Sequence, residues 1–168
     1  MKLDKVTRLF LLTTAALLLY WLESVIGLPG VIPCTLGLSL ITSLFALWVL
    51  NFREAAILTL LWVLLGAMIF RGFEGFLYYG PASVVAFLAI WGLRALLKDE
   101  QIWIAGCMGT VVHGLSCLFM LMWLQRTLSW LLFFPAVMLF SIVWGLVMGL
   151  CAQFVIIKGK NVWKTIFK

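Results

Sequence analysis

The sequence predicts an all-α integral membrane protein built as a bundle of six transmembrane helices. Of its 168 residues, 65% are hydrophobic and only 11% are charged, whereas a soluble domain is about one quarter charged. Its apolar runs approach the roughly 20 residues that a helix needs to cross a hydrocarbon core of about 30 Å. The chain has too little polar surface for a soluble domain, so we expect a single transmembrane domain over residues 1–168.

Charges, prolines and glycines divide the chain into six apolar segments, and each is expected to form one helix. The approximate ranges are Leu9–Leu28, Cys34–Leu50, Ala55–Phe70, Phe76–Leu97, Ile102–Leu124 and Leu128–Ile157. The third range is short for a spanning helix, which favours little tilt, extension into its flanks or shielding by neighbours. The first segment lacks a small-x-small cleavage site, so we expect it to be retained rather than removed as a signal peptide.

Lys and Arg residues are divided unequally between alternate connections, and this bias predicts orientation. With a cytoplasmic N-terminus, only Arg71 and Arg126 of the 12 Lys and Arg residues face outside. We therefore expect both termini in the cytoplasm and the chain in the bacterial inner membrane, with the lipid bilayer as its main partner. The basic residues behind the net charge of +6 lie at the ends of apolar runs. This is the arrangement expected of segments that face an anionic cytoplasmic leaflet, so we expect no nucleic-acid partner.

The connection between the first two segments, Glu23 to Ser39, reads ESVIGLPGVIPCTLGLS and contains no Lys or Arg. Pro29 and Pro33 prevent one continuous helix there. Glu23 lies near the outer end of the first helix, where an ionisable group is costly and marks a candidate functional site. It is either a ligand or cation contact or an interhelical partner for Arg71.

His113 falls midway along the fifth segment and is the only histidine in the chain. It is either an interhelical hydrogen-bond partner or a ligand contact. The four cysteines are scattered singly, without a CxxC pair. A metal site needs several ligands at defined spacings, so we expect neither a metal nor a cofactor.

The expected outer loop from Arg71 to Pro81, RGFEGFLYYGP, combines both signs of charge with glycines and aromatic residues. One interpretation is a belt of aromatic residues at the headgroup level, with Tyr20 and Trp21 at the same depth. The other is a gating loop over a pocket. The second interpretation makes Arg71, Glu74, Tyr78 and Tyr79 candidate ligand contacts.

Small residues recur every fourth position in the fifth and sixth segments. In lipid, such faces let helix backbones approach closely, which drives association. We therefore expect both faces to form helix contacts within the bundle. The residues are Gly106, Thr110 and Gly114 in the fifth segment and Ser141, Gly145 and Gly149 in the sixth.

Several motifs together resemble the heptaprenyl diphosphate synthase component I family of membrane proteins, also called the Gx transporter family. They are ES followed by a proline, PCTLGLS, FREA, LLGAMIF and GTVVHG, and they extend from about Tyr20 to Phe154. Glu23, Gly37, Gly66 and His113 match the expected pattern. Thr35, Leu40, Trp62 and Gly114 stand where the family is expected to carry Lys, Asn, Arg and Asn.

The family's six-helix layout resembles the substrate-binding S components of energy-coupling-factor importers. That resemblance implies a small-molecule site in the outer half of the bundle, with separate coupling and ATPase subunits as partners. We expect a rather apolar ligand near Glu23, Trp62 and His113. The alternative is a non-catalytic accessory subunit for a prenyl diphosphate, quinone or cell-envelope enzyme. We expect no enzymatic activity, because one histidine and six acids do not assemble a catalytic cluster.

Overall fold

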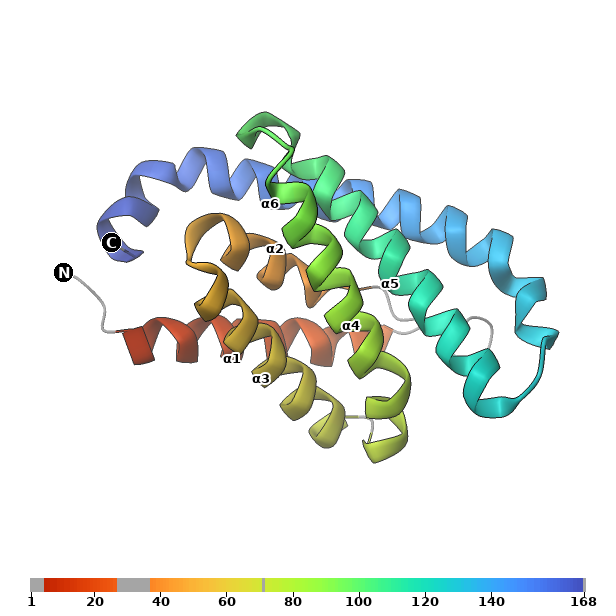
Figure 1. Ribbon diagram of the computed structural model, residues 1–168. Coiled ribbons are helices and arrows are strands. Elements are labelled where there is room, and N and C mark those ends of the chain that lie inside the picture. Colours follow the sequence, from red (N-terminus) through yellow and green to blue (C-terminus); the bar gives the residue numbers. More distant parts are fainter. Residues whose placement is uncertain (1–4, 27–36, 71, 168) are drawn as a thin grey trace.

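The computed structural model describes residues 5–26, 37–70 and 72–167, and these form a bundle of α-helices (Figure 1). Within these ranges the prediction of an all-helical protein with six α-helices is confirmed. The helices are α1 (Lys5–Ile26), α2 (Leu40–Val49), α3 (Phe52–Phe70), α4 (Gly72–Arg94), α5 (Ile102–Gln125) and α6 (Phe134–Phe167). Two 3₁₀ turns, η1 (Asp99–Gln101) and η2 (Ser129–Phe133), precede α5 and α6.

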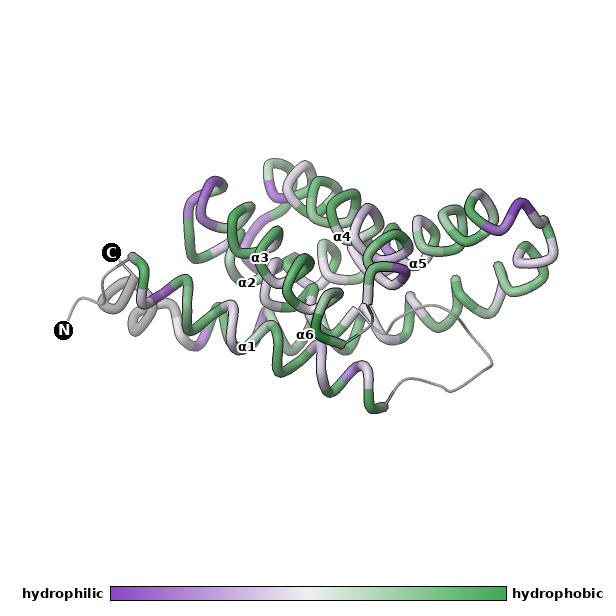
Figure 2. Tube along the Cα trace, turned by 90° about the horizontal axis from the view of Figure 1, so that it is seen from below, coloured by the Kyte–Doolittle hydropathy of each residue, from purple (hydrophilic) through white to green (hydrophobic). Residues whose placement is uncertain are grey.

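Five of these helices are long and apolar enough to cross a membrane, and α2 is the short exception at 10 residues. At about 1.5 Å per residue, α2 covers only about half of a hydrocarbon core. Hydrophobic residues make up most of each helix, and hydrophilic residues gather near helix ends and connections (Figure 2). The chain is therefore a multi-pass membrane protein in which α2 needs the other helices around it.

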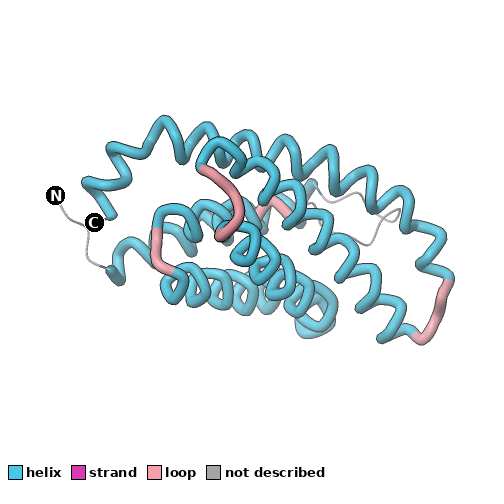
Figure 3. Tube along the Cα trace, turned by 45° about the horizontal axis from the view of Figure 1, so that its top comes forward, coloured by secondary structure: helices cyan, strands magenta, loops and turns pink. Residues whose placement is uncertain are grey.

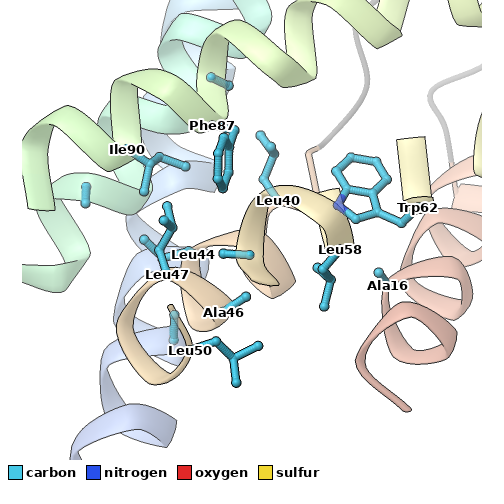
Figure 4. Packing of buried hydrophobic residues seen from close by; sticks show 14 of the residues in the cluster. Ala16, Leu40, Leu44, Ala46, Leu47, Leu50, Leu58, Trp62, Phe87 and Ile90 are labelled. Atoms are coloured by element: carbon cyan, nitrogen blue, oxygen red, sulfur yellow. The ribbon is translucent and has the colours of Figure 1, made fainter. Parts of the chain in front are cut away.

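The short helix α2 forms the centre of the bundle and contacts each of the other five helices. Leu44 and Leu47 of α2 are fully buried. Side chains of α1, α3 and α4 surround it in Figure 4, among them Ala16, Leu58 and Ile90. Such packing shields a helix that is too short to span a bilayer by itself.

The predicted start of the second helix at Cys34 is wrong. Gly37 has a φ of +70°, which lies in the left-handed region and interrupts a right-handed helix. A turn follows, in which the Leu40 N–H donates to the Gly37 carbonyl at 3.0 Å, and α2 begins only at Leu40. Residues 34–36 lie outside the described part of the chain.

The predicted outer loop from Arg71 to Pro81 is also wrong, because α4 already begins at Gly72 and contains Pro81. Glycines and a proline suggested a loop, since proline removes one helical N–H donor. In membrane helices a proline is tolerated, because neighbouring groups and local adjustments satisfy the freed carbonyl. Arg71 itself lies outside the described residues.

Other boundaries differ by a few residues from those expected. The third helix extends to Phe52 and reaches 19 residues, so the expected shortness belongs to the second helix instead. The sixth helix begins at Phe134, after η2, and its 34 residues give it a length of roughly 50 Å. It is therefore longer than a bilayer's hydrocarbon core.

The described connections between helices are short (Figure 3). The first turns of α1 and the last turns of α6 lie at the same end of the bundle (Figure 1). The Arg94 guanidinium lies 6.0 Å from the centre of the Trp48 ring, and this cation–π contact joins the end of α4 to α2.

Candidate functional site

Among the residues that the structure describes, Glu23 is the one buried carboxylate, with only 1% of its surface exposed. The Gly37 N–H donates a 2.8 Å hydrogen bond to Glu23 Oε1. This bond joins the last turns of α1 to the chain just before α2. A carboxylate is also favoured near the N-terminus of a helix, where unpaired N–H groups carry positive partial charge. Glu23 therefore holds the start of α2 in place.

Gly37 brings Glu23 close to the middle of α5. A Cβ placed on Gly37 would lie 3.6 Å from Thr110 Cγ2 and 3.9 Å from His113 Cδ2. Gly37 thus contacts Glu23 through its N–H and faces Thr110 and His113 on another side. The sequence predicted a rather apolar ligand near Glu23 and His113, and the structure places Gly37 next to both residues.

His113 lies on the buried face of α5, with 3% of its surface exposed. Its Nε2 atom is 3.7 Å from the Cys117 sulfur, one helical turn further along. Ionisable residues within membrane helices are rare and mark functional sites by default. Two such residues, Glu23 and His113, therefore meet around one glycine.

Trp62, a candidate ligand contact, lies in the hydrophobic core beside α2 (Figure 4). Its indole N–H donates to Ser43 Oγ at 3.0 Å. Ser43 Oγ in turn lies 2.8 Å from Thr59 Oγ1. These three buried side chains form a hydrogen-bonded network between α2 and α3, in which the indole N–H has its partner.

One interpretation of the sequence placed Tyr20 in an aromatic belt, but Tyr20 is 4% exposed and belongs to the core. Its ring centre lies 5.9 Å from that of Trp62 and 6.0 Å from that of Phe70. A Cβ on Gly66 would come within 3.0 Å of the Tyr20 ring, so Gly66 provides the space for this ring. Trp21, the next residue, is exposed.

The remaining candidates on α4 do not join the buried group. Glu74 is exposed in the first turn of α4. Tyr78 and Tyr79 are half-buried, and their rings meet edge to face with centres 6.5 Å apart. The structure therefore brings Glu23, Gly37 and His113 together and places Trp62 in the core, with Glu74 at the surface.

The two faces of small residues lie against each other in the α5–α6 interface. A Cβ on Gly106 would lie 2.5 Å from the Gly149 Cα, and a Cβ on Gly145 would overlap the Thr110 hydroxyl. Thr110 Oγ1 donates to the Ser141 carbonyl across the interface at 2.9 Å. A Cβ on Gly114 would meet Ser141 Oγ at 2.5 Å. The backbones approach as closely as glycine allows.

A further bond closes this interface at the start of α5. The Trp103 N–H donates to Gln153 Oε1 of α6 at 3.2 Å. The first N–H groups of a helix have no partner within the helix, so Gln153 supplies one from the neighbouring helix. The small residues and this bond together align α5 with α6.

Several residues that shape the site carried weak signals in the sequence. Ser43 and Thr59 lie in apolar runs and pair only because α2 packs on α3. Gly37 appeared as a family position without a structural role. In the part of the chain that the structure describes, no group of three His, Cys, Asp or Glu side chains is placed to hold a metal ion.

The fold and these intramembrane polar groups define the class of the protein, a multi-pass helical membrane protein with ionisable side chains buried between its helices. The family model described as heptaprenyl diphosphate synthase component I matches residues 12–155. The chain therefore belongs to this family, as the sequence motifs predicted. No curated protein and no solved structure matches the chain.

Proposed function

We propose that this protein is the small-molecule-binding membrane subunit of a transport system, with its ligand bound beside Glu23 and His113 in the outer half of the bundle. The observation that carries this proposal is the meeting of a buried carboxylate, Gly37 and a buried imidazole. Small-molecule sites are mostly apolar, with a few polar groups that fix orientation. Glu23 and His113 would supply two such polar groups.

The ligand proposed for this site has an aromatic or isoprenoid body and one cationic or hydrogen-bonding head. Glu23 favours a cationic or donating head, because it is the buried carboxylate here. Trp62 and Gly114 stand where the family was expected to carry Arg and Asn. Trp62 adds apolar surface rather than charge, which disfavours a diphosphate at this position.

The proposed topology has both termini in the cytoplasm, as in S components of energy-coupling-factor importers, with separate coupling and ATPase subunits as partners. The charge bias of the connections supports this orientation. The proposed role is non-catalytic, because one histidine and six acids do not supply a nucleophile, a base and metal ligands in one place.

Glu23→Gln tests the proposal, because glutamine keeps the oxygen that accepts the Gly37 N–H but removes the charge. Native mass spectrometry with untargeted ligand release should find a small molecule on the unmodified protein. We expect at least about tenfold less of it on Glu23→Gln, since hydrogen bonds to charged groups contribute about 1.5–3 kcal/mol. Glu54→Gln, a half-buried carboxylate at the start of α3, is the matched control.

Thermal unfolding of the same variants separates a binding role from a structural one. The proposed role predicts nearly unchanged unfolding of Glu23→Gln together with loss of the ligand. Marked destabilisation with unchanged ligand content would instead make Glu23 a purely structural carboxylate and would contradict the proposal.

The second candidate function is an accessory subunit for a prenyl diphosphate, quinone or cell-envelope enzyme. The family is described as a synthase component, which favours a partner synthase. Affinity purification from native membranes distinguishes the two candidates. Recovery of coupling and ATPase subunits supports transport, whereas stoichiometric recovery of a prenyl synthase subunit supports the accessory role.

A further inference from the structure

An apolar groove lies between α1 and α6, with α2 at its base. Short α2 packs against both α1 and α6, whereas within the described residues α1 and α6 do not pack closely on each other. The gap contains a cavity of about 170 Å³. Its lining residues are Leu12, Ile41, Thr42, Phe45, Ala152 and Val155.

A wider surface cavity of about 610 Å³ adjoins this groove along α6. The two share Val155, and the wider cavity extends along α6 to Lys158. Apolar atoms make up most of the surface of both. The lining therefore changes from the hydrocarbon side chains around α2 to the Lys158 ammonium further along α6. The last turns of α6 lie at the same end of the bundle as the first turns of α1 (Figure 1).

The charge at this end of the groove is positive. Lys158 is exposed, and its ammonium lies 5.5 Å from the centre of the Phe154 ring. Arg8 lies one helical turn before Leu12 on α1, so a second cation is placed toward the same end. Among the described residues that line the two cavities there is no acidic side chain.

The groove needs a hydrocarbon occupant. Water has few polar partners there, and an empty apolar cavity loses packing contacts in proportion to its volume. In a bilayer, the available hydrocarbon is a lipid chain, and an anionic headgroup on that chain would reach the Lys158 ammonium at the edge of the wider cavity. Cations near a membrane surface attract anionic lipids.

We propose that the α1–α2–α6 groove is a binding site for an anionic phospholipid, with one acyl chain against Phe45 and Val155 and the phosphate headgroup at Lys158. This site is separate from the one proposed at Glu23. Glu23 lies 11 residues beyond Leu12 on α1, roughly 16 Å along the helix. The two sites are therefore tested independently.

Native mass spectrometry with phosphatidylglycerol and phosphatidylcholine of identical chains tests the headgroup. The unmodified protein should retain phosphatidylglycerol in preference. Lys158→Gln should lower the bound phosphatidylglycerol about fivefold, the equivalent of about 1 kcal/mol for one cation near the headgroup. Lys98→Gln removes the same charge from an exposed position outside the two cavities and should leave retention unchanged.

A second pair of variants tests the groove itself. Val155→Phe fills it from an exposed position of α6, so both phospholipids should be lost. Val143→Phe adds the same bulk at another exposed position of α6, outside both cavities, and should retain phosphatidylglycerol as the unmodified protein does.

Three results would overturn the proposal. The first is equal retention of the two phospholipids by the unmodified protein. The second is an equal effect of Lys158→Gln and Lys98→Gln, which would reduce the preference to overall surface charge. The third is recovery of a prenyl phosphate or a partner polypeptide in place of phosphatidylglycerol. If Val155→Phe releases that molecule, the groove has a different occupant.

Discussion

The α5–α6 interface and the surroundings of α2 are held together in different ways. At the α5–α6 interface, Gly106 faces Gly149 so closely that a Cβ would lie 2.5 Å from the opposite Cα. Around α2, large side chains such as Phe45 and Leu12 line a cavity of about 170 Å³ between α1 and α6.

The difference shows how helices associate where water does not drive burial. Lipid tails are as apolar as leucine, so close van der Waals contact and hydrogen bonds have to supply the association energy. At the α5–α6 interface, glycines carry no side chain, so the two backbones come into direct contact. The surroundings of α2 depend more on polar links, such as Glu23 to Gly37 and Ser43 to Trp62, and they leave space for another molecule.

The largest expected effect comes from placing bulk in the α5–α6 interface. In Gly145→Leu the new side chain would overlap the Thr110 hydroxyl and approach the Cys107 backbone. Overpacking typically costs 1–3 kcal/mol, and contact with rigid backbone places this variant at about 3 kcal/mol or more. The unfolding temperature in detergent should fall by roughly 6–12 °C.

Gly92→Leu is the matched control for that change, because a Cβ on Gly92 meets nothing within 4 Å. It should unfold close to the unmodified protein. Equal unfolding of the two variants would contradict the description of the α5–α6 interface as the close-packed one.

A smaller effect is expected when a polar link beside α2 is removed. Ser43→Ala takes away the acceptor of the Trp62 indole N–H and the partner of Thr59. A buried donor without a partner costs about 1–3 kcal/mol, so we expect a loss near 2 kcal/mol in denaturant unfolding. Ser129→Ala, which breaks an exposed bond to Thr127, should have little effect; similar losses would show that burial does not matter here.

A third variant tests the turn that Glu23 holds. In Gly37→Ala the residue keeps a φ of +70°, and its Cβ would lie 3.3 Å from Leu40 Cδ1. Left-handed backbone costs an alanine about 1–2 kcal/mol. Gly72→Ala has nearly the same φ of +69° and open space around the Cβ.

We therefore expect Gly72→Ala to lose only the stability that the left-handed backbone costs. Gly37→Ala should lose slightly more stability and should also bind less ligand. The measurements are unfolding in detergent and native mass spectrometry of the bound molecule. Ligand content unchanged in Gly37→Ala would separate the turn from the proposed site.

The smallest perturbation is the introduction of single cysteines, whose labelling tests the orientation of the bundle in the membrane. Single cysteines at Lys98 or Glu74, both exposed, should leave folding unchanged in a chain whose native cysteines are replaced. The proposed orientation predicts that an impermeant thiol reagent added to intact cells labels position 74 and spares position 98. The opposite result would invert the topology and place Glu23 in the cytoplasmic half.

Much of the architecture followed from the sequence because the bilayer imposes strict rules. Apolar runs of nearly 20 residues predict spanning helices, and the expected fifth helix, Ile102–Leu124, differs from α5 by one residue at its end. The small residues recur at every fourth position, and this spacing alone places them on one helical face. The motifs were sufficient to predict the family, which the match over residues 12–155 confirms.

Local signals misled where residue types have more than one use. Glycines and Pro81 suggested a loop, although a membrane helix tolerates proline when its neighbours satisfy the backbone. The apolar run from Cys34 suggested a full helix, although the backbone conformation of Gly37 delays α2 until Leu40. The hydropathy of a segment gives no information about the backbone conformation of one glycine within it.

Only the tertiary structure decided which polar groups meet. Glu23 and His113 are 90 positions apart in the sequence, and they adjoin the same glycine because α1, α2 and α5 pack together. Trp62 finds Ser43 only because α2 lies beside α3. Sequence periodicity determines the face of a helix on which a residue lies, whereas the neighbour of that face depends on how side-chain volumes from all six helices fit.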